Sequence, residues 1–177
     1  MINIRQFSCN PFEERSYLVW DGDGTAVVVD PGFLGEAEVA AAEAFLKAHS
    51  LRLQAILLTH AHFDHIYGVR PFTDRYGIPV YVHPDEAVVL QGEALLAGDC
   101  GMPVPDTGWT PVPVQDGEVL QVGTMQFRVI ATPGHSPAAS VTTARTGNTC
   151  SAETRSLPAP SATPSCAGAT MTGKSFP

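Results

Sequence analysis

The sequence predicts a mixed α/β fold for residues 1–137, and three observations support this class. Short β-branched runs alternate with amphipathic stretches, turn residues separate them, and hairpin patterns precede strand–helix units. This order is typical of a protein whose helices pack on a mixed sheet. A chain of 177 residues is long enough for one hydrophobic core of ordinary size.

The N-terminal part predicts three strands and a covering helix. A Gly-rich turn, Asp21–Gly24, joins the second and third strands as a hairpin. Between Gly35 and His49, apolar residues recur at helical spacing while the acids lie mostly on other faces, which predicts an amphipathic helix on the sheet. The three predicted strands are residues 2–8, 16–21 and 25–30.

The middle of the chain predicts strand–helix units and then a second hairpin. Gly77 stands where helices often end, and Pro84 stands where they often begin. Residues 91–118 are rich in Gly, Pro and Asp, so we expect a long loop there. The predicted elements are strands at 53–59 and 79–83, helices at 66–76 and 84–90, and a hairpin of 119–122 with 125–131.

The chain changes character after Pro137. Of the 40 residues that follow, 29 are Ala, Thr, Ser, Pro or Gly, and only four are large and apolar. Such a composition buries too little apolar surface to build a core. We therefore expect a folded domain at 1–137 and an atypical, low-complexity tail at 138–177 that packs poorly.

Charge and hydropathy narrow the classes of function. The net charge is −8, and Lys and Arg form no cluster, which argues against nucleic acid or an anionic membrane as the main partner. No apolar run is long enough for a membrane helix, and the start lacks a basic region followed by an apolar stretch. We expect a cytoplasmic protein with a small-molecule substrate; the oligomeric state is left open.

The segment THAHFDH at 59–65 carries most of the predicted chemistry. It follows a strand, so a loop can gather its side chains around one point. An interpretation as ordinary surface histidines is weak, because three of the six histidines of the chain fall in this one segment. The side chains that can bind a metal are His60, His62, Asp64 and His65.

A third histidine is expected to complete the first metal site. A catalytic zinc ion usually has three protein ligands and keeps one position for water, so His60 and His62 need a partner. His135 is the candidate, because the Pro-Gly turn before it fixes the backbone after a predicted strand. The imidazoles favour zinc, and the added carboxylate makes iron or manganese alternatives.

Three motifs in this order resemble the metallo-β-lactamase-fold hydrolases: VVDPG at 28–32, H-x-H-x-D-H at 60–65 and TPGH at 132–135. The sequence is most similar to small glyoxalase II-like (hydroxyacylglutathione hydrolase-like) members without a glutathione-binding domain. The resemblance covers residues 1–137. It implies an αββα four-layer sandwich, with helices outside two mixed sheets and the site at one edge of the sheets.

The resemblance also assigns roles to residues. It implies that His60, His62 and His135 hold one metal and that Asp64 and His65 hold a second. Asp64 and Asp30 are the candidate catalytic carboxylates, and Asp30 would act by orienting the ligand loop. Two adjacent cations would lower the pKa of a shared water, so the implied reaction is hydrolysis of a small acyl thioester or ester. An iron-dependent sulfur (persulfide) dioxygenase is the alternative within this fold.

The chain departs from the family pattern after His135. That pattern continues with a Gly-Asp, whose aspartate bridges both metals, and then a further histidine. No Asp or His follows His135 in this sequence, so the second metal would keep only Asp64 and His65. The second half of the sandwich is expected to be incomplete. An inactive remnant that binds a single metal is therefore an alternative to a working hydrolase.

A shift of reading frame near Pro137 accounts for this departure. When each new codon joins the third base of one codon to the first two of the next, residues 148–155 permit Tyr-Leu-Phe-Ser-Gly-Asp-Thr, which contains the missing Gly-Asp. The same reading permits Pro-Gly-Ser-Val-Cys-Tyr-Tyr from Pro137 and Glu-Leu-Arg-Gly-Gly-Asp over 164–172. We therefore expect the tail to arise from a frameshift, and activity of the chain as written to be doubtful.

Overall fold

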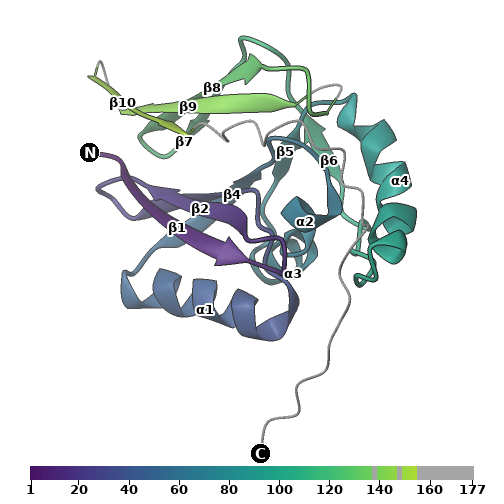
Figure 1. Cartoon of the computed structure of the whole chain (residues 1–177). Helices are drawn as coiled ribbons and strands as arrows, with labels where there is room; N and C mark the ends of the chain where they lie inside the picture. The colour runs from purple at the N-terminus through teal and green to yellow at the C-terminus, as the bar shows by residue number, and fades with distance from the viewer. Residues whose placement is uncertain (137–138, 147–148, 155–177) are drawn as a thin grey trace, which may run out of the picture.

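The structure, a computed structural model, describes residues 1–136, 139–146 and 149–154. Two sheets lie face to face, with helices outside the larger one (Figure 1). The mixed α/β class predicted from the sequence is confirmed. The elements are β1 (Asn3–Cys9), β2 (Glu14–Trp20), β3 (Thr25–Val29), α1 (Gly35–Ala48), β4 (Arg52–Leu57), α2 (Phe63–Ile66), α3 (Val69–Tyr76), β5 (Val80–Val82), α4 (Glu86–Asp99), β6 (Pro111–Pro113), β7 (Val119–Val122), β8 (Met125–Ala131), β9 (Ser140–Thr146) and β10 (Thr149–Thr154).

The larger sheet has the strand order β1-β2-β3-β4-β5-β6. Its first three strands pair antiparallel, as the predicted hairpin requires, and β3 to β6 pair parallel. Asp21 closes the hairpin, because its Oδ1 accepts the N–H groups of Asp23 and Thr25 at 3.0 and 2.9 Å. The carboxyl ends of the parallel strands meet at one edge, where loops commonly carry functional side chains.

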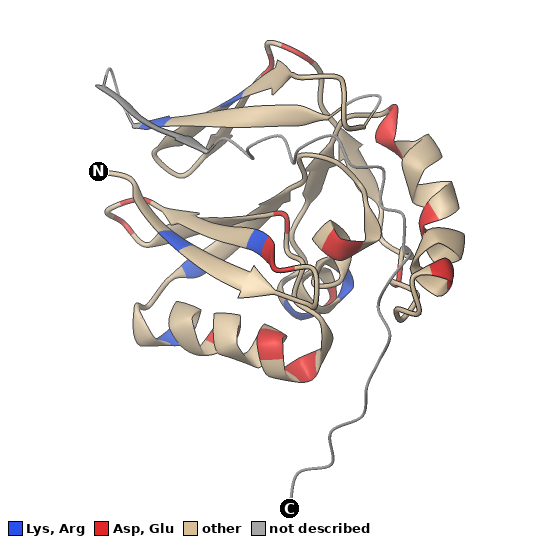
Figure 2. Cartoon of the chain, viewed as in Figure 1, with Lys and Arg blue, Asp and Glu red and all other residues tan. Residues whose placement is uncertain are grey.

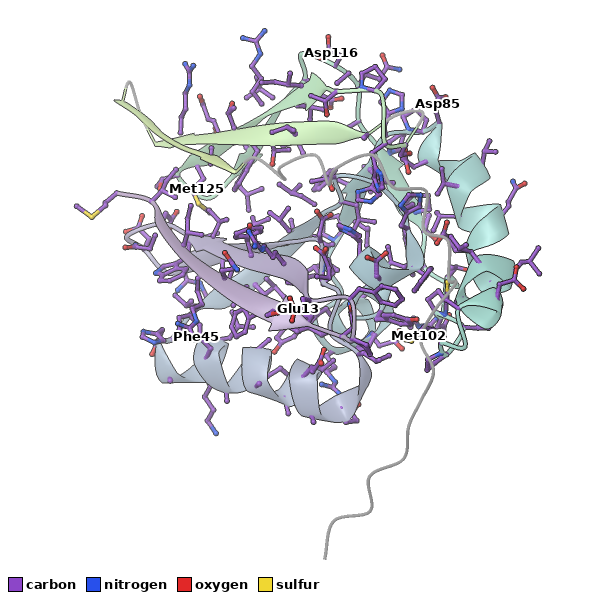
Figure 3. The ribbon with its side chains drawn as sticks, viewed as in Figure 1. Glu13, Phe45, Asp85, Met102, Asp116 and Met125 are labelled. Carbon is purple, nitrogen blue, oxygen red and sulfur yellow. The ribbon has the colours of Figure 1, made fainter. Side chains whose placement is uncertain are left out.

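Two apolar cores hold the layers together. Helices α1 and α3 place Val39 and Phe72 on one face of the larger sheet, against strand residues such as Ile56. The smaller sheet, in the order β10-β9-β8-β7, packs Met125 and Phe127 on the other face. Figure 3 shows Met125 between the two sheets. The described residues thus form helix, sheet and sheet layers, and among them no helix covers the outer face of the smaller sheet (Figure 1).

The smaller sheet is antiparallel in all its described pairs rather than mixed, and it extends beyond the boundary predicted at residue 137. Strand β9 pairs with β8 from Met125↔Thr146 to Ala131↔Ser140. Ser140, Thr142 and Ala144 are its buried residues. Threonine is common in strands, and β8 already provides large apolar side chains on the buried face, so small residues of β9 can complete it. A count of large apolar residues therefore underestimated the ability of this segment to form a buried strand. Strand β10, at Thr149–Thr154, pairs with β9, and residues 155–177 of the predicted tail lie outside the described residues.

Helix α4 occupies much of the stretch predicted as a loop at 91–118. It runs to Asp99, and β6 adds a further strand at 111–113. The sequence pattern concealed the helix because its buried residues are Glu86, Glu93 and Ala97, whereas Val88 and Leu95 are more than 70% exposed. A buried helix face is normally recognised in a sequence by a stripe of apolar residues. Here two glutamates lie on the buried face, so the stripe is missing.

The helix predicted at 66–76 is two helices, α2 and α3, separated at Gly68. The Gly68 N–H donates to the Pro31 carbonyl at 2.7 Å. A Cβ at this position would lie 2.8 Å from the same oxygen, so only glycine permits the approach. The break places the connection between α2 and α3 against the loop that follows β3.

Charged residues are dispersed over the described residues. Figure 2 shows Lys and Arg on several separate elements, and Asp and Glu mainly on the helices and connecting loops. Across the described ranges, no helix combines the length and the apolar character needed to cross a membrane.

Candidate metal centre

The ligand loop connects β4 to α2. His60 and His62 lie in this loop, as predicted. Asp64 and His65 were expected in the loop as well but lie on α2, which begins at Phe63, three residues before the predicted helix start at 66. Asn10, the residue after β1, supports the start of α2, because its Nδ2 donates to the carbonyl of Asp64 at 2.8 Å. The histidines and the aspartate of the motif are therefore held in place both by the β4–α2 connection and by the residue that follows β1.

Three imidazoles converge at the end of the larger sheet. The ring centroids of His60, His62 and His135 lie 4.7 to 5.0 Å apart, with the rings nearly perpendicular to one another. Their ligand nitrogens are mutually within 4.8 Å, a grouping that could hold one metal ion. His135 reaches the site because Ser140, at the start of β9, donates its N–H to the Thr59 carbonyl at 2.8 Å. The three residues predicted to share a metal thus lie together.

Hydrogen bonds fix the ring of His60 in an orientation suited to a metal. The Thr59 hydroxyl donates to Asp30 Oδ2 at 2.7 Å, so it must accept from His60 Nδ1–H, 2.9 Å away. This places the lone pair on His60 Nε2, a buried atom with no hydrogen-bond partner in the described structure. Buried polar atoms are rarely left unpartnered, so a metal ligand role fits this nitrogen.

Asp30 has the position expected of a residue that orients the ligand loop. Its Oδ1 accepts the Thr59 N–H at 2.7 Å, in addition to the hydroxyl bond to Oδ2. Its backbone has a φ of 46°, a conformation uncommon outside glycine, at the turn that leaves β3. Asp30 thus reaches His60 through Thr59 rather than belonging to either ligand group.

The electrostatics of the site favour the neutral forms of His60 and His62. Burial lowers the pKa of His60, and the neighbouring His65, His62 and His135 lower it further. Burial and His135 likewise lower the pKa of His62. Neutral imidazoles are the form that binds a metal, so these side chains need lose no proton near pH 7.

A second group contains Glu14, Asp64 and His65, whose ligand atoms also lie within 4.8 Å of one another. Glu14 Oε2 is 3.1 Å from His65 Nε2, and Asp64 Oδ2 is 3.8 Å from the same nitrogen. The sequence indicated Asp64 and His65 but not Glu14. Strand β2 begins two residues before the predicted start at Ser16, and this extension brings Glu14 to the site.

The metal-free protein should lose stability as pH rises from about 6.5 to about 9. Burial alone lowers the pKa of His65, but contact with Asp30 and the charges of Glu14 and Asp64 outweigh it and raise the pKa to about 9 from 6.5. The folded state therefore holds a proton that the unfolded state releases in this window, so the unfolding free energy falls there. Thermal unfolding of stripped protein at pH 6, 7.5 and 9 measures this. His65→Asn should have a flatter profile, and equal slopes would contradict the expectation.

Helix α4 contributes two buried carboxylates that the sequence did not indicate. Glu86 Oε2 accepts the N–H of Ala61 at 2.9 Å, and its Oε1 accepts the hydroxyl of Ser136. Glu93 accepts the N–H of Phe63 at 2.5 Å. Glu86 thus connects the two segments that carry the three histidines of the first group. Acids on a helix otherwise suggest a solvent-exposed face, so only the fold could reveal this role.

The other two histidines lie in neither ligand group. His49, at the end of α1, packs beside Phe45 with ring centroids 4.2 Å apart. His83 follows β5, and its Nδ1 is 3.8 Å from a carboxylate oxygen of Asp85. All five metal-ligand candidates from the sequence therefore fall in the two groups, and these two histidines do not.

The arrangement of ligands and sheets agrees with the sequence comparison. The family model described as "Metallo-beta-lactamase superfamily" matches residues 10–151. The chain belongs to this superfamily. The match extends beyond the predicted domain boundary at 137, as strand β9 does.

Two solved structures and one curated relative show how far the similarity extends. BLEG-1, a B3 metallo-beta-lactamase, is 34% identical with a TM-score of 0.70, over 80% of this chain and 66% of that chain. TTHA1623, solved in a di-iron-bound form, is 34% identical with a TM-score of 0.66, over 78% and 65%. Hydroxyacylglutathione hydrolase GloC of Haemophilus influenzae is 27% identical over 142 residues, 77% of this chain and 63% of that protein.

This metallo-β-lactamase superfamily chain is shorter than its relatives. It spans 62%, 55% and 63% of the length of three curated proteins that it matches. The activity of these longer proteins is therefore only proposed for this chain.

Proposed function

We propose that this chain is a metal-dependent hydrolase that acts on a small acyl thioester or ester, with the metal held by His60, His62 and His135. The observation that carries the proposal is the unpartnered, buried Nε2 of His60 within three converging imidazoles. A hydrogen-bonded core histidine would use both nitrogens, whereas this one directs a lone pair toward two other imidazoles. The similarity to GloC, named as a hydroxyacylglutathione hydrolase, supports a thioester as the substrate.

The protein residues have distinct tasks in this mechanism. His60, His62 and His135 would hold a cation, and this ion would supply an acidified water and polarise a carbonyl oxygen. Thr59 holds His60 in the tautomer that can bind, and Asp30 holds Thr59. Asp64, with its side chain 22% exposed, is the carboxylate assigned to take up the proton released by the attacking water.

The native metal is part of the proposal. Three imidazoles suit zinc, and the di-iron form of TTHA1623 supports iron as the alternative. An iron-loaded chain could instead be a persulfide dioxygenase. Because no Asp or His follows His135, a chain that binds one metal without turnover is the remaining alternative.

The experiment compares metal-stripped protein with samples reloaded with zinc, manganese or iron. Each sample is offered the hydroxyacyl thioester of glutathione, an activated ester and a β-lactam, and oxygen uptake is followed with glutathione persulfide. We expect thioester or ester hydrolysis that disappears on stripping and returns on reloading. Oxygen uptake by the iron sample would replace the proposal with a dioxygenase. Bound metal without turnover of any substrate would contradict hydrolysis and support the remnant.

A further inference from the structure

We propose that a cavity between the two sheets, at the end opposite the metal centre, binds a small organic anion that carries hydroxyl groups. The cavity has a volume of about 370 Å³, at the small end of the range for ligand sites. Strands β3, β4 and β5 of the larger sheet and β7 of the smaller sheet contribute to its walls (Figure 1). Its polar side chains are those of Thr25, Arg52, Gln54, Tyr81 and Gln121.

The cavity is remote from the metal centre. Thr25 and Arg52 begin β3 and β4, whereas His60 and His62 follow the other end of β4. A strand of six residues such as β4 spans roughly 20 Å. A small molecule in the cavity therefore does not reach the histidines, so this site is separate from the proposed hydrolytic one and goes beyond it.

A β-bulge in β4 directs a polar side chain into the cavity. Ala26 of β3 pairs with Leu53 of β4. The next pair is Val27 with Ala55, so Gln54 is an extra residue in this pairing. Because of the bulge, Gln54 and Ala55 both line the cavity, where regular alternation would turn one of them away. Bulges commonly re-aim side chains next to functional sites.

Arg52 supplies the charge that selects an anion. Among the described residues that line the cavity it is the only charged one, although the chain as a whole has a net charge of −8. Its Nη2 donates to the carbonyl of Asp23 at 2.8 Å, which fixes the guanidinium beside the cavity. A guanidinium has five N–H donors and no acceptor, so other N–H groups of Arg52 can bind a carboxylate or a phosphate.

The amides and hydroxyls of the walls indicate what else the ligand carries. Gln121 Nε2 donates to the Gly123 carbonyl at 2.7 Å, so its Oε1 is left to accept. Gln54 adds a second amide, and Thr25 and Tyr81 add hydroxyl groups that can accept or donate. Hydroxyl groups on a ligand pair with such atoms. Hydroxy acids and sugar phosphates therefore match the cavity better than purely apolar acids.

Asp21 holds the walls of the cavity in place. Its Oδ2 accepts the N–H and the hydroxyl of Thr124 at 2.9 and 2.8 Å, and its Oδ1 accepts the Thr25 N–H at 2.9 Å. These bonds join the β2–β3 turn to the β7–β8 turn, across the two sheets. The Asp21 carboxylate is buried and does not line the cavity. The cavity is thus preformed, as ligand sites usually are.

The competing interpretation is a water-filled gap with Arg52 as an ordinary solvated side chain. Such a gap has no defined affinity for an anion, and weak effects of added salt would not saturate. A binding site gives a saturable response that depends on Arg52.

The test is an NMR titration of the isotope-labelled full-length chain with ribose 5-phosphate and, separately, with gluconate. Both carry hydroxyl groups, and they distinguish a phosphate from a carboxylate as the bound group. We expect saturable shifts at the signals of Thr25, Gln54 and Gln121 with at least one of the two anions. Arg52→Gln should lower that affinity by roughly 10- to 100-fold, the loss expected for hydrogen bonds to a charged group.

Arg128→Gln is the matched control. Arg128 is exposed on β8, and its neighbour Phe127 is buried between the sheets, so Arg128 faces away from the cavity. This variant should keep the wild-type affinity, and the spectra themselves show whether each variant is folded.

The outcomes do not depend on hydrolysis, so the proposed function is tested separately. Saturable shifts with ribose 5-phosphate alone would assign phosphates to the site, and with gluconate alone carboxylates. No saturable shift at the cavity with either anion, or unchanged affinity in Arg52→Gln, would overturn the inference. Shifts confined to the histidine segments would also overturn it and place anion binding at the metal centre.

Discussion

His62→Ala should abolish metal binding at the three-histidine site, and thioester hydrolysis with it. Two remaining imidazoles leave a cation without the three protein ligands that catalytic sites use. The loss in affinity should therefore exceed the roughly 10- to 100-fold effect of removing a supporting residue. His62 is half-buried, whereas His60 is 5% exposed, so substitution at His62 disturbs the fold less.

The control for this variant is His49→Ala. It removes one imidazole from the end of α1, where His49 packs beside Phe45 outside both ligand groups. Chelator competition should give wild-type zinc affinity for His49→Ala and a large loss for His62→Ala. Wild-type affinity and turnover in His62→Ala would contradict the assignment of the first site.

Glu86→Gln should weaken metal binding at the first site by about 10- to 100-fold. The Glu86 carboxylate accepts hydrogen bonds from Ala61, which lies between His60 and His62, and from Ser136, which follows His135. Glutamine keeps the shape but has one acceptor oxygen and no charge, so it cannot hold both segments in the same way. The metal should then stabilise the variant less than the wild type, by about 1.4 to 2.7 kcal/mol under conditions that saturate the wild type.

Zinc affinity and metal-dependent stability distinguish a Glu86 that positions the histidines from a Glu86 that only stabilises the fold. If Glu86 only stabilised the fold, Glu86→Gln would lower the unfolding temperature equally with and without metal, and zinc affinity would stay unchanged. If it positions the histidines, the metal-dependent part of the stability shrinks. Asp99→Asn is the matched control, because Asp99 is an exposed carboxylate at the end of the same helix. It should leave first-site zinc affinity at the wild-type value.

The sequence predicted the parts of the site that depend on local order. His60, His62, Asp64 and His65 fall within six residues after an apolar strand, so one connection brings them together. His135 could be added because catalytic zinc sites need a third ligand. The ligand loop and His135 could both be found because a metal-binding residue type follows directly after a predicted strand.

The parts that the sequence did not predict depend on packing between distant elements. Glu14 enters the site because β2 begins earlier than its apolar pattern suggests. Glu86 and Glu93 lie on the buried face of α4, where charged side chains concealed the helix. Strand β9 forms from Ser, Thr and Ala because β8 offers a paired edge. None of these contacts has a local signature.

The frameshift near Pro137 stays a prediction, because residues 155–177 and the junction itself lie outside the described residues. Sequencing the coding DNA from His135 to Lys174 should reveal one inserted or missing base. The corrected chain would regain the Gly-Asp segment and a longer C-terminal part. An uninterrupted frame in several independent isolates would show that the tail is a genuine product.

We expect metal held by the three histidines to make this chain a hydrolase. The most direct measurement is the rate of hydroxyacyl thioester hydrolysis by stripped protein as zinc is added and bound zinc is counted. We expect no hydrolysis without metal and a rate that rises with bound zinc until the sites are filled. Full occupancy of the three-histidine site with no hydrolysis would refute the proposed function and identify the chain as a metal-binding remnant.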